Sequence, residues 1–250
     1  MTEGRIAGLR ASAVIAVPTA GIGVSFGVLA EPMIGGLDAT DDRQTLLKGS
    51  LKNIRTIFSR PGMPLLFAMQ WAPIGIFAGA EGLLVPFVTQ QWNGSVSPGA
   101  LMVALPIGMF VGQGTLGRLL TPHARQQLVC PLMCVMGAPL ALFAIVDDLW
   151  ILWVALFVSG IGFAYSLGLQ LPFAEALGGP TRGQGFALLG AGLMTVQGIG
   201  PAFGGVSGEL FGVGMTITAC GSLIVIVAAV IYLTRAWPGR YRYRSEDAGR

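Results

Sequence analysis

Residues 210–234 read LFGVGMTITACGSLIVIVAAVIYLT, an uncharged stretch that ends at Arg235. A helix of about 20 residues at about 1.5 Å per residue covers the roughly 30 Å hydrocarbon layer of a bilayer, so this stretch is long enough to cross a membrane. Six other uncharged stretches of 20 residues or more precede it, and charged residues make up only 11% of the chain. Soluble domains carry roughly 25% charged residues. Together with a mean hydropathy of +0.71, this composition excludes a water-soluble enzyme.

Polar residues divide the longest uncharged stretch, residues 82–117, into two parts. The side chains from Gln90 to Ser95 would need hydrogen-bond partners inside lipid, so we expect a loop there, and the first part then extends back through Glu81. The apolar runs are apolar on all sides, whereas strands of a membrane barrel alternate polar and apolar residues. We therefore predict an all-α, polytopic membrane helix bundle of about seven transmembrane helices, at residues 11–29, 64–89, 99–116, 128–146, 150–173, 186–208 and 215–233.

The basic residues predict the orientation of this bundle, because basic loops are retained in the cytoplasm. With seven spans, one side receives thirteen arginines and lysines and the other receives only Arg5 and Arg10. We expect an integral protein of the plasma or inner membrane, with the C-terminus in the cytoplasm and the N-terminus outside. The net charge of +3 follows from this topology and does not predict a nucleic-acid partner.

The first apolar run also has features of a secretory signal, because Arg5 and Arg10 precede it and Val28-Leu29-Ala30 would suit a small-residue cleavage site. Its 19-residue core is longer than the usual core of about 7–15 residues. Cleavage would also place the five basic residues of the 31–60 stretch outside the cell. Both points favour a membrane span.

The sequence contains no pattern that predicts catalysis, a cofactor or a metal. Residues 112–117 satisfy the dinucleotide pattern GxGxxG but lie at the end of a membrane helix, where no strand leads into the glycines. No phosphate-binding loop ends in Lys-Ser or Lys-Thr. Cys130, Cys134, Cys220 and the single histidine, His123, are too few and too scattered to indicate a metal site. We expect neither an enzyme nor a cofactor.

Glycines four residues apart predict close helix contacts, because each pair lies on one face and lets a neighbouring backbone approach. Such pairs are Gly75 with Gly79 and Gly108 with Gly112. The 186–208 span continues the pattern through Gly200, Gly204 and Gly208. A stripe of this kind suits a tight helix seam, and it also suits a seam that slides in a transporter.

Two of these segments carry a resemblance to a known family. The stretch Gly200-Pro201-Ala202-Phe203-Gly204-Gly205 resembles the Gly-Pro-x-x-Gly-Gly element of the major facilitator superfamily of transporters. The loop from Gly117 through Arg118 to Arg125 is similar to that superfamily's cytoplasmic Gly-Arg-Leu-Ala-Asp-Arg-x-Gly-Arg loop, with Thr121 in place of its Asp and Ala124 in place of its Gly. The resemblance implies gating or helix-seam roles for Gly117, Arg118, Arg125, Gly200, Pro201, Gly204, Gly205 and Gly208.

The resemblance also implies a division of the chain. Residues 1–30 would be the last helix of an incomplete N-terminal half, and residues 31–60 a cytoplasmic connector with an amphipathic helix. Residues 61–234 would form the six-helix C-terminal transport half, and residues 235–250 a basic cytoplasmic tail. On this view the chain is a carrier that lacks five of twelve helices, and its partners would include the missing half or a second protomer.

Glu81 is the strongest candidate for a solute or proton site, because it is the only charge inside a predicted span and a charge at that depth is costly. Gln70 lies eleven residues earlier at nearly the same helical angle. In the 150–173 span, Ser159, Ser166 and Gln170 fall on one stripe. The resemblance implies that both helices line the central cavity. Structural hydrogen bonding is the competing interpretation for the glutamines and serines.

These features predict a transporter that moves a small solute by alternating access, with proton-coupled efflux as one form of the hypothesis. Glu81 would bind a proton or a cationic group of the solute. Pro73 and Pro86 bracket this part of the helix and remove backbone donors, so they are candidate hinges.

A second hypothesis belongs to another class of protein. The chain could be a non-transporting integral membrane protein, either a decayed fragment or an assembly or regulatory partner that uses its helix faces. A seven-helix receptor is a third interpretation, but the sequence offers no recessed ligand site for it.

Overall fold

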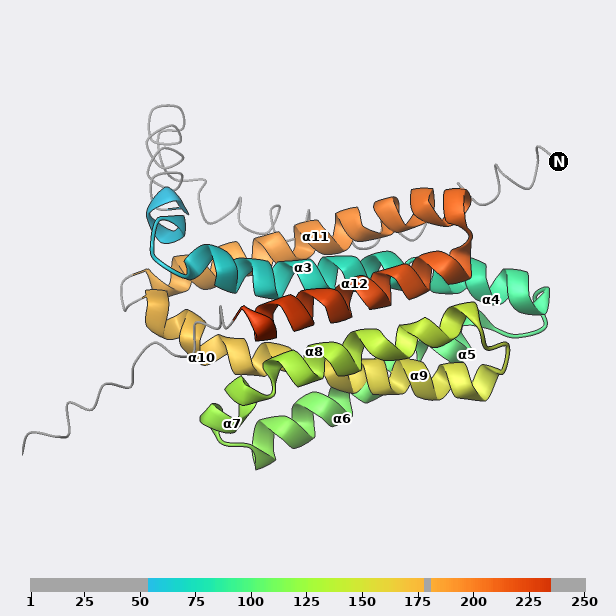
Figure 1. Cartoon of the computed structure of the whole chain (residues 1–250), viewed down its shortest axis with the longest axis horizontal. Helices are drawn as coiled ribbons and strands as arrows, with labels where there is room; N and C mark the ends of the chain where they lie inside the picture. Colours follow the sequence, from blue (N-terminus) through green and yellow to red (C-terminus); the bar gives the residue numbers. More distant parts are fainter. Residues whose placement is uncertain (1–53, 178–180, 235–250) are drawn as a thin grey trace, which may run out of the picture.

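The computed structural model describes residues 54–177 and 181–234, and every regular element among them is a helix (Figure 1). Residues 54–58 form a short helical segment ahead of the first long helix. The predicted span at 11–29, residues 31–53 of the connector and the tail at 235–250 lie outside the described residues. The elements are α3 (Met63–Glu81), α4 (Leu84–Trp92), α5 (Pro98–Met102), α6 (Ala104–Leu119), α7 (Pro122–Gln127), α8 (Val129–Gly137), the 3₁₀ helix η1 (Ala138–Ala144), α9 (Leu149–Gly162), α10 (Tyr165–Leu177), α11 (Arg182–Phe211) and α12 (Val213–Leu233).

Five segments of the described chain are long and apolar enough to cross a membrane. Each contains one of the predicted spans, so the prediction of an all-helical bundle of membrane-length segments is confirmed for these residues. These five segments indicate an integral membrane protein. The segments are Met63–Trp92, Pro98–Leu119, Leu149–Leu177, Arg182–Phe211 and Val213–Leu233.

The remaining predicted span, at 128–146, corresponds to the shorter apolar segment Val129–Ala144, which combines α8 with η1. A 3₁₀ helix rises about 2.0 Å per residue, against about 1.5 Å in an α-helix. The nine residues of α8 and the seven of η1 therefore extend about 28 Å together, close to the roughly 30 Å of a hydrocarbon layer. The tighter winding of η1 compensates for the small number of residues.

Short breaks divide three of the membrane-length segments into two helices each. The first segment is interrupted at residues 82–83, directly after Glu81. Pro86 has no N–H to donate to the carbonyl oxygen of Gly82. The Leu83 N–H bonds to the Ala80 oxygen at 3.0 Å, three residues back, and not to the Gly79 oxygen four residues back. The helix continues through Pro73 without a break. The other breaks fall at residue 103, three residues before a proline, and at residues 163–164.

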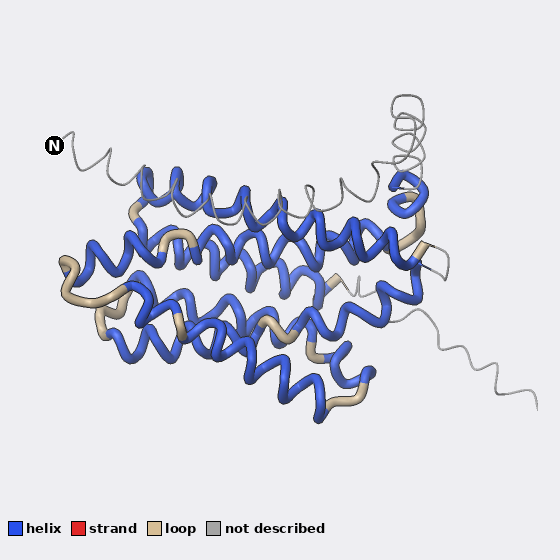
Figure 2. Tube along the Cα trace, turned by 180° about the vertical axis from the view of Figure 1, so that it is seen from behind, coloured by secondary structure: helices blue, strands red, loops and turns tan. Residues whose placement is uncertain are grey.

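The helices form one bundle in which α3 lies between neighbours on several sides (Figures 1 and 2). It packs against α11 along its length and also contacts α12 and α10. On the other side of the bundle α9 packs against α6 and α8, and α12 packs against α8 and η1. Aromatic rings fill the interior next to the connector: Phe67 stacks on Phe58 with centroids 4.8 Å apart and meets the edge of Phe173 at 5.0 Å.

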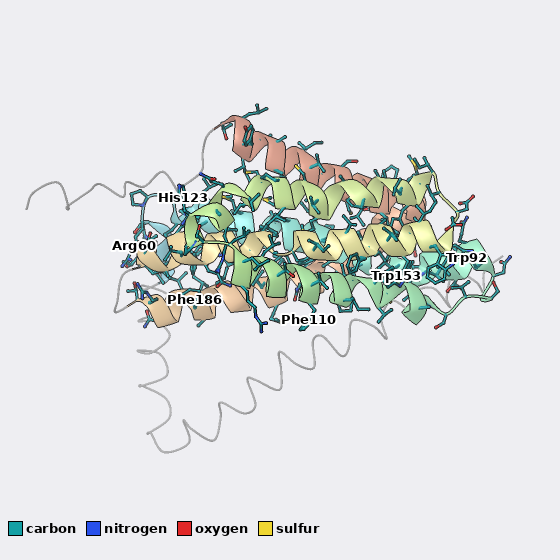
Figure 3. All side chains as sticks on the ribbon, turned by 90° about the horizontal axis from the view of Figure 1, so that it is seen from below. Arg60, Trp92, Phe110, His123, Trp153 and Phe186 are labelled. Carbon is teal, nitrogen blue, oxygen red and sulfur yellow. The ribbon has the colours of Figure 1, made fainter. Side chains whose placement is uncertain are left out.

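The described basic residues gather at one end of the bundle. Figure 3 shows Arg60 and His123 at one end and Trp92 at the other. The five arginines of the described residues all belong to loops or helix ends at the Arg60 end, whereas the turn Asp147-Asp148 lies at the Trp92 end. We call these the arginine end and the aspartate end. The arginines of the described chain are Arg55, Arg60, Arg118, Arg125 and Arg182.

Arginine side chains close helix C-termini at the arginine end. The Arg60 guanidinium donates hydrogen bonds to the carbonyl oxygens of Ala176, at 2.9 Å, and of Leu177, while Arg182 donates to the Ala174 oxygen at 3.3 Å. The last carbonyls of a helix have no partner within the helix and carry partial negative charge, so cations stabilise them. The C-terminal end of α10 is thus bound by Arg60, which precedes the helix in the sequence, and by Arg182, which follows it.

Candidate functional site

The predicted glycine pairs lie in two close helix contacts. Gly108 and Gly112 bring α6 against the backbone of α9 at Phe157 and Ile161. Gly75, Gly79, Gly200 and Gly204 form the seam of α3 and α11. A Cβ atom placed on Gly200 would lie 2.5 Å from the Gly75 carbonyl oxygen, and one placed on Gly79 would lie 3.1 Å from the Gly200 oxygen. A Cβ on Gly204 would meet the Gly79 oxygen at a still shorter distance. Real Cβ atoms essentially never show the contacts at Gly200 and Gly204, so at these two positions the backbones approach to a distance that only glycine permits.

The seam extends to both sides of Glu81. A Cβ placed on Gly82 would lie 2.8 Å from the Pro201 Cβ atom, and one on Gly208 would lie 2.9 Å from a methyl carbon of Leu83. The break in the α3–α4 segment therefore rests against the middle of α11. Gly205, the last glycine of the motif, has no atom within 4 Å of its Cβ position among the described residues and takes no part in the seam.

Glu81 is the last residue of α3, half-buried, directly before the break. About eleven residues separate it from Trp92, or roughly 16 Å along a helix axis. Within the described part of the chain, its carboxylate has neither a hydrogen bond nor an ion pair. A carboxylate at this depth without a partner is unusual, because transfer of an unpaired charge into an apolar environment is costly.

The helices extend beyond the ends predicted from the sequence, so Glu81 is not the only charge inside one. α6 contains Arg118, α10 contains Glu175, and α11 contains Arg182 and Glu209. These four residues are exposed, and each lies within a few residues of a helix end. The prediction that Glu81 is the only charge inside a span is therefore wrong for the full helices. Glu81 differs from the others because apolar helix lies on both sides of it, α3 before it and α4 after it.

Two predicted polar residues are buried in the bundle without partners. Gln70 in α3 is 4% exposed and Ser159 in α9 is fully buried, and the structure shows no hydrogen bond to the Gln70 Nε2 or Ser159 Oγ atom. Buried polar groups normally have a hydrogen-bond partner, because a buried group without one lowers the stability of the fold. The competing interpretation was that these side chains form structural hydrogen bonds. Neither of the two atoms forms one within the described chain.

Tyr165 joins this group, and the sequence analysis did not identify it. It is fully buried at the start of α10, and its hydroxyl donates to the backbone oxygen of Gln70 at 3.4 Å. The residue lies between Ser159 and Ser166 in the sequence, though not on their helical face, so a polar group in an apolar run was the signal that could have found it.

Ser166 and Gln170 have different surroundings from Ser159. The break at residues 163–164 separates them from it. The Ser166 hydroxyl donates to the Phe163 oxygen at 3.0 Å within the same segment, and Gln170 is exposed. The structure therefore brings Gln70, Ser159 and Tyr165 into the interior but leaves Gln170 at the surface.

A cavity of about 380 Å³ lies between α3, α11 and α12 beside the seam. Gly75, Gly79, Gly200 and Gly204 line it, together with Ser207, Thr216 and mainly apolar side chains. The Thr216 hydroxyl donates to the Gly212 oxygen at 2.9 Å, so it is already paired. Glu81 and Gln70 do not line this space, whose walls suit an apolar group.

The loop that follows α6 is held by Arg125. Its guanidinium donates to the carbonyl oxygens of Gly117 and of Leu120, the latter at 3.0 Å, and so closes the C-terminus of α6. Thr121 caps α7 by accepting a hydrogen bond from the Ala124 N–H at 3.3 Å. Arg118 is exposed and has no hydrogen bond or ion pair with any described residue.

Comparison with known proteins does not identify a family for this chain. A scan against models of protein families found no match to this chain, and a search of curated proteins found none either. Among the described residues, no three histidine, cysteine, aspartate or glutamate side chains are grouped as metal ligands. The site is therefore defined by its own geometry: an unpaired carboxylate at a helix break that rests on a glycine seam.

Proposed function

We propose that this chain is a membrane transporter, or a part of one, that moves a small solute by alternating access, as carriers of the major facilitator superfamily do. The observation that carries the proposal is Glu81, a half-buried carboxylate without a partner in the described chain, placed where a membrane-length helix is interrupted. Ionisable residues at such depth mark solute, ion or proton pathways by default.

The surroundings of Glu81 supply what a moving site needs. The break at residues 82–83 leaves backbone groups outside regular helix pairing, and interrupted helices are typical of solute sites in transporters. In the glycine seam between α3 and α11, the backbones meet directly at Gly75, Gly79, Gly200 and Gly204. A shift of α11 along α3 would break the hydrogen bond from the Trp71 ring to the Leu189 oxygen, 3.1 Å long, which lies beside these glycines. The carboxylate would then face alternate sides as the seam moves.

Proton coupling and efflux are the finer parts of the proposal. A carboxylate that exchanges a proton for a cationic solute group keeps the site neutral in each state, which avoids a buried net charge. The placement of all five described arginines at one end supports an orientation with that end in the cytoplasm. Apolar walls around the nearby cavity favour a lipophilic solute.

The test is flux across a membrane that contains the purified full chain. Liposomes would be loaded with a panel of lipophilic cations and neutral solutes, with and without a pH gradient. We expect pH-dependent flux for at least one solute and its loss in Glu81→Gln. The matched control is Glu209→Gln, which neutralises an exposed carboxylate near a helix end. Equal flux in both variants would contradict the role of Glu81.

A second candidate function is a non-transporting membrane protein that assembles with other helices. The observation that favours it is the exposure of α11. Only 6% of its most apolar 18-residue stretch is buried in the described bundle, whereas 56% of the corresponding stretch of Leu149–Leu177 is buried. A face left this open suits a partner. Absence of flux for every solute, in liposomes that contain correctly inserted chain, would favour this function over transport.

A further inference from the structure

An apolar groove of about 630 Å³ lies on the outside of the bundle, where η1 packs beside α9. Small residues at the start of η1 leave the hollow, and side chains four residues apart on α9 share the helical face that lines it. Two of the α9 side chains, Trp150 and Val154, are more than half exposed, so the groove is open to the surroundings. We call this space the outer groove, and its walls include Ala138, Pro139 and Leu142 of η1 and Trp150, Val154 and Val158 of α9.

The outer groove has nearly the depth of one membrane leaflet. The helix between Trp150 and Val158 extends about 12 Å along its axis, and half of a roughly 30 Å hydrocarbon layer is about 15 Å. Trp150 is 74% exposed in the first turn of α9, at the aspartate end. Tryptophan is enriched at the level of lipid headgroups. An acyl chain whose headgroup lies level with Trp150 would therefore run along the groove.

Two aspartates lie at the mouth of the outer groove. Asp147 and Asp148 belong to the turn that joins η1 to α9, and both are exposed. The Asp148 Oδ1 atom accepts hydrogen bonds from the backbone N–H groups of Trp150 and Ile151 at 2.9 and 3.0 Å. The Asp147 Oδ1 atom accepts one from Gln91 Nε2 at 2.5 Å. The second oxygen of each carboxylate has no partner among the described residues.

No basic side chain of the described residues balances these two charges, because all five described arginines lie at the arginine end. The free carboxylate oxygens can accept charge-assisted hydrogen bonds from an ammonium group. The indole N–H of Trp150 has no acceptor in the described chain, so it is a donor for a phosphate. The mouth of the groove thus offers acceptors for a cation and a donor for an anion, above walls that suit an acyl chain.

We propose that the outer groove binds phosphatidylethanolamine, with an acyl chain along α9 and the ammonium group at Asp147 and Asp148. The primary ammonium donates hydrogen bonds, which the trimethylammonium group of phosphatidylcholine cannot do. Phosphatidylglycerol carries a net negative charge that the aspartates repel. The binding does not depend on transport and applies to either candidate function.

Native mass spectrometry of the purified full chain tests the proposal. The chain is incubated in detergent with phosphatidylethanolamine, phosphatidylcholine or phosphatidylglycerol of identical acyl chains, and the lipid-bound fraction is measured over a range of lipid concentrations. We expect phosphatidylethanolamine to bind most tightly. The other two lipids should bind about tenfold more weakly, the effect expected for loss of one hydrogen bond to a charged group.

The acyl-chain contact is tested by filling the groove. Ala138 is exposed at the groove wall, so Ala138→Phe should occupy the space and remove the tightly bound lipid. The matched control is Ala229→Phe, which makes the same change at an exposed alanine of α12 that does not line the groove. The control should bind phosphatidylethanolamine as the unaltered chain does.

The headgroup contact is tested by Asp147→Asn combined with Asp148→Asn. Asparagine keeps a side-chain oxygen for the Gln91 hydrogen bond and for the cap of α9, so the turn is preserved while its charge is removed. This variant should bind phosphatidylethanolamine about as weakly as phosphatidylcholine. Glu175→Gln combined with Glu209→Gln is the control, because it removes two exposed carboxylates elsewhere on the described chain.

Four results would overturn the proposal: equal binding of the three lipids, tighter binding of phosphatidylglycerol, an unchanged bound fraction in Ala138→Phe, or equal losses in the test variants and their controls. The asparagine variant keeps the hydrogen bonds of the turn, so it remains a test if Ala138→Phe does not accumulate.

Discussion

A Cβ atom on Gly200 of α11 would come within 2.5 Å of the backbone oxygen of Gly75 in α3. At this contact the two helices meet backbone to backbone. The closeness depends on four glycines in two segments that are more than a hundred residues apart, so it is a property of the folded bundle.

The seam predicts a strong and selective effect of added methyl groups. Gly200→Ala or Gly204→Ala forces α11 away from α3, and overpacking of this kind costs about 1–3 kcal/mol. The midpoint of thermal unfolding in detergent should fall. Gly114→Ala is the control, because no described atom lies within 4 Å of its Cβ position. Equal midpoints for all three variants would show that the helices are not held this closely.

Arg125 should contribute to stability and Arg118 should not. Arg125→Ala removes hydrogen bonds to two carbonyl oxygens at the end of α6, which we expect to destabilise the fold by about 1–3 kcal/mol. Arg118→Ala removes an exposed side chain without a partner in the described chain, and such changes usually stay within about 0.5 kcal/mol. Unfolding midpoints of the two variants measure the difference. A larger loss for Arg118→Ala would contradict this reading of the loop.

Ser159→Ala separates a structural role of the buried hydroxyl from a functional one. The Oγ atom is buried without a partner, so its removal should leave the free energy of unfolding unchanged or raise it by about 1 kcal/mol. If the hydroxyl serves the solute or a proton, flux should fall in the same variant. The two measurements are made on one preparation. A marked loss of stability would show that the hydroxyl has a structural partner after all.

The arginine end should face the cytoplasm. In a chain without native cysteines, Asn93→Cys places a thiol in the exposed loop at the aspartate end, and His123→Cys places one at the arginine end. A membrane-impermeant maleimide added to intact cells should label Asn93→Cys at once and His123→Cys only after permeabilisation. The reverse pattern would invert the proposed orientation.

Residues 64–233 show how far local composition predicts a membrane fold. Five predicted spans lie inside the observed segments, because hydropathy is a local property, whereas the predicted span 128–146 is longer than the observed Val129–Ala144. The loop predicted from Gln90 to Ser95 begins only at Asn93, because α4 continues through Trp92. The predicted spans ended too early, because they stopped before a charged residue. In the structure α10 continues past Glu175 and α11 continues past Glu209. The two candidate hinges lie in different surroundings: α3 continues through Pro73, whereas the break at residues 82–83 lies shortly before Pro86. Their role as hinges stays a prediction.

The candidate site was predicted less completely than the fold. Glu81 is recognisable from sequence because a charge inside an apolar run needs no tertiary information. Tyr165 was missed because a tyrosine in such a run looks like a packing residue until its hydroxyl is seen to reach the Gln70 backbone. Gln170 shares a helical angle with Ser159 on paper, but the break at residues 163–164 intervenes, and one side chain is exposed while the other is buried.

The sequence by itself determined where the described helices lie and which of their ends carry arginine, because the cost of placing polar groups and charges in lipid acts residue by residue. Only the tertiary structure decided which glycines meet another backbone. Gly200 and Gly204 lie in a seam, while Gly205 of the same motif has open space beside it. The reason is that a helix sequence shows which residues share a face, but the face that a neighbour covers depends on how all the helices pack together.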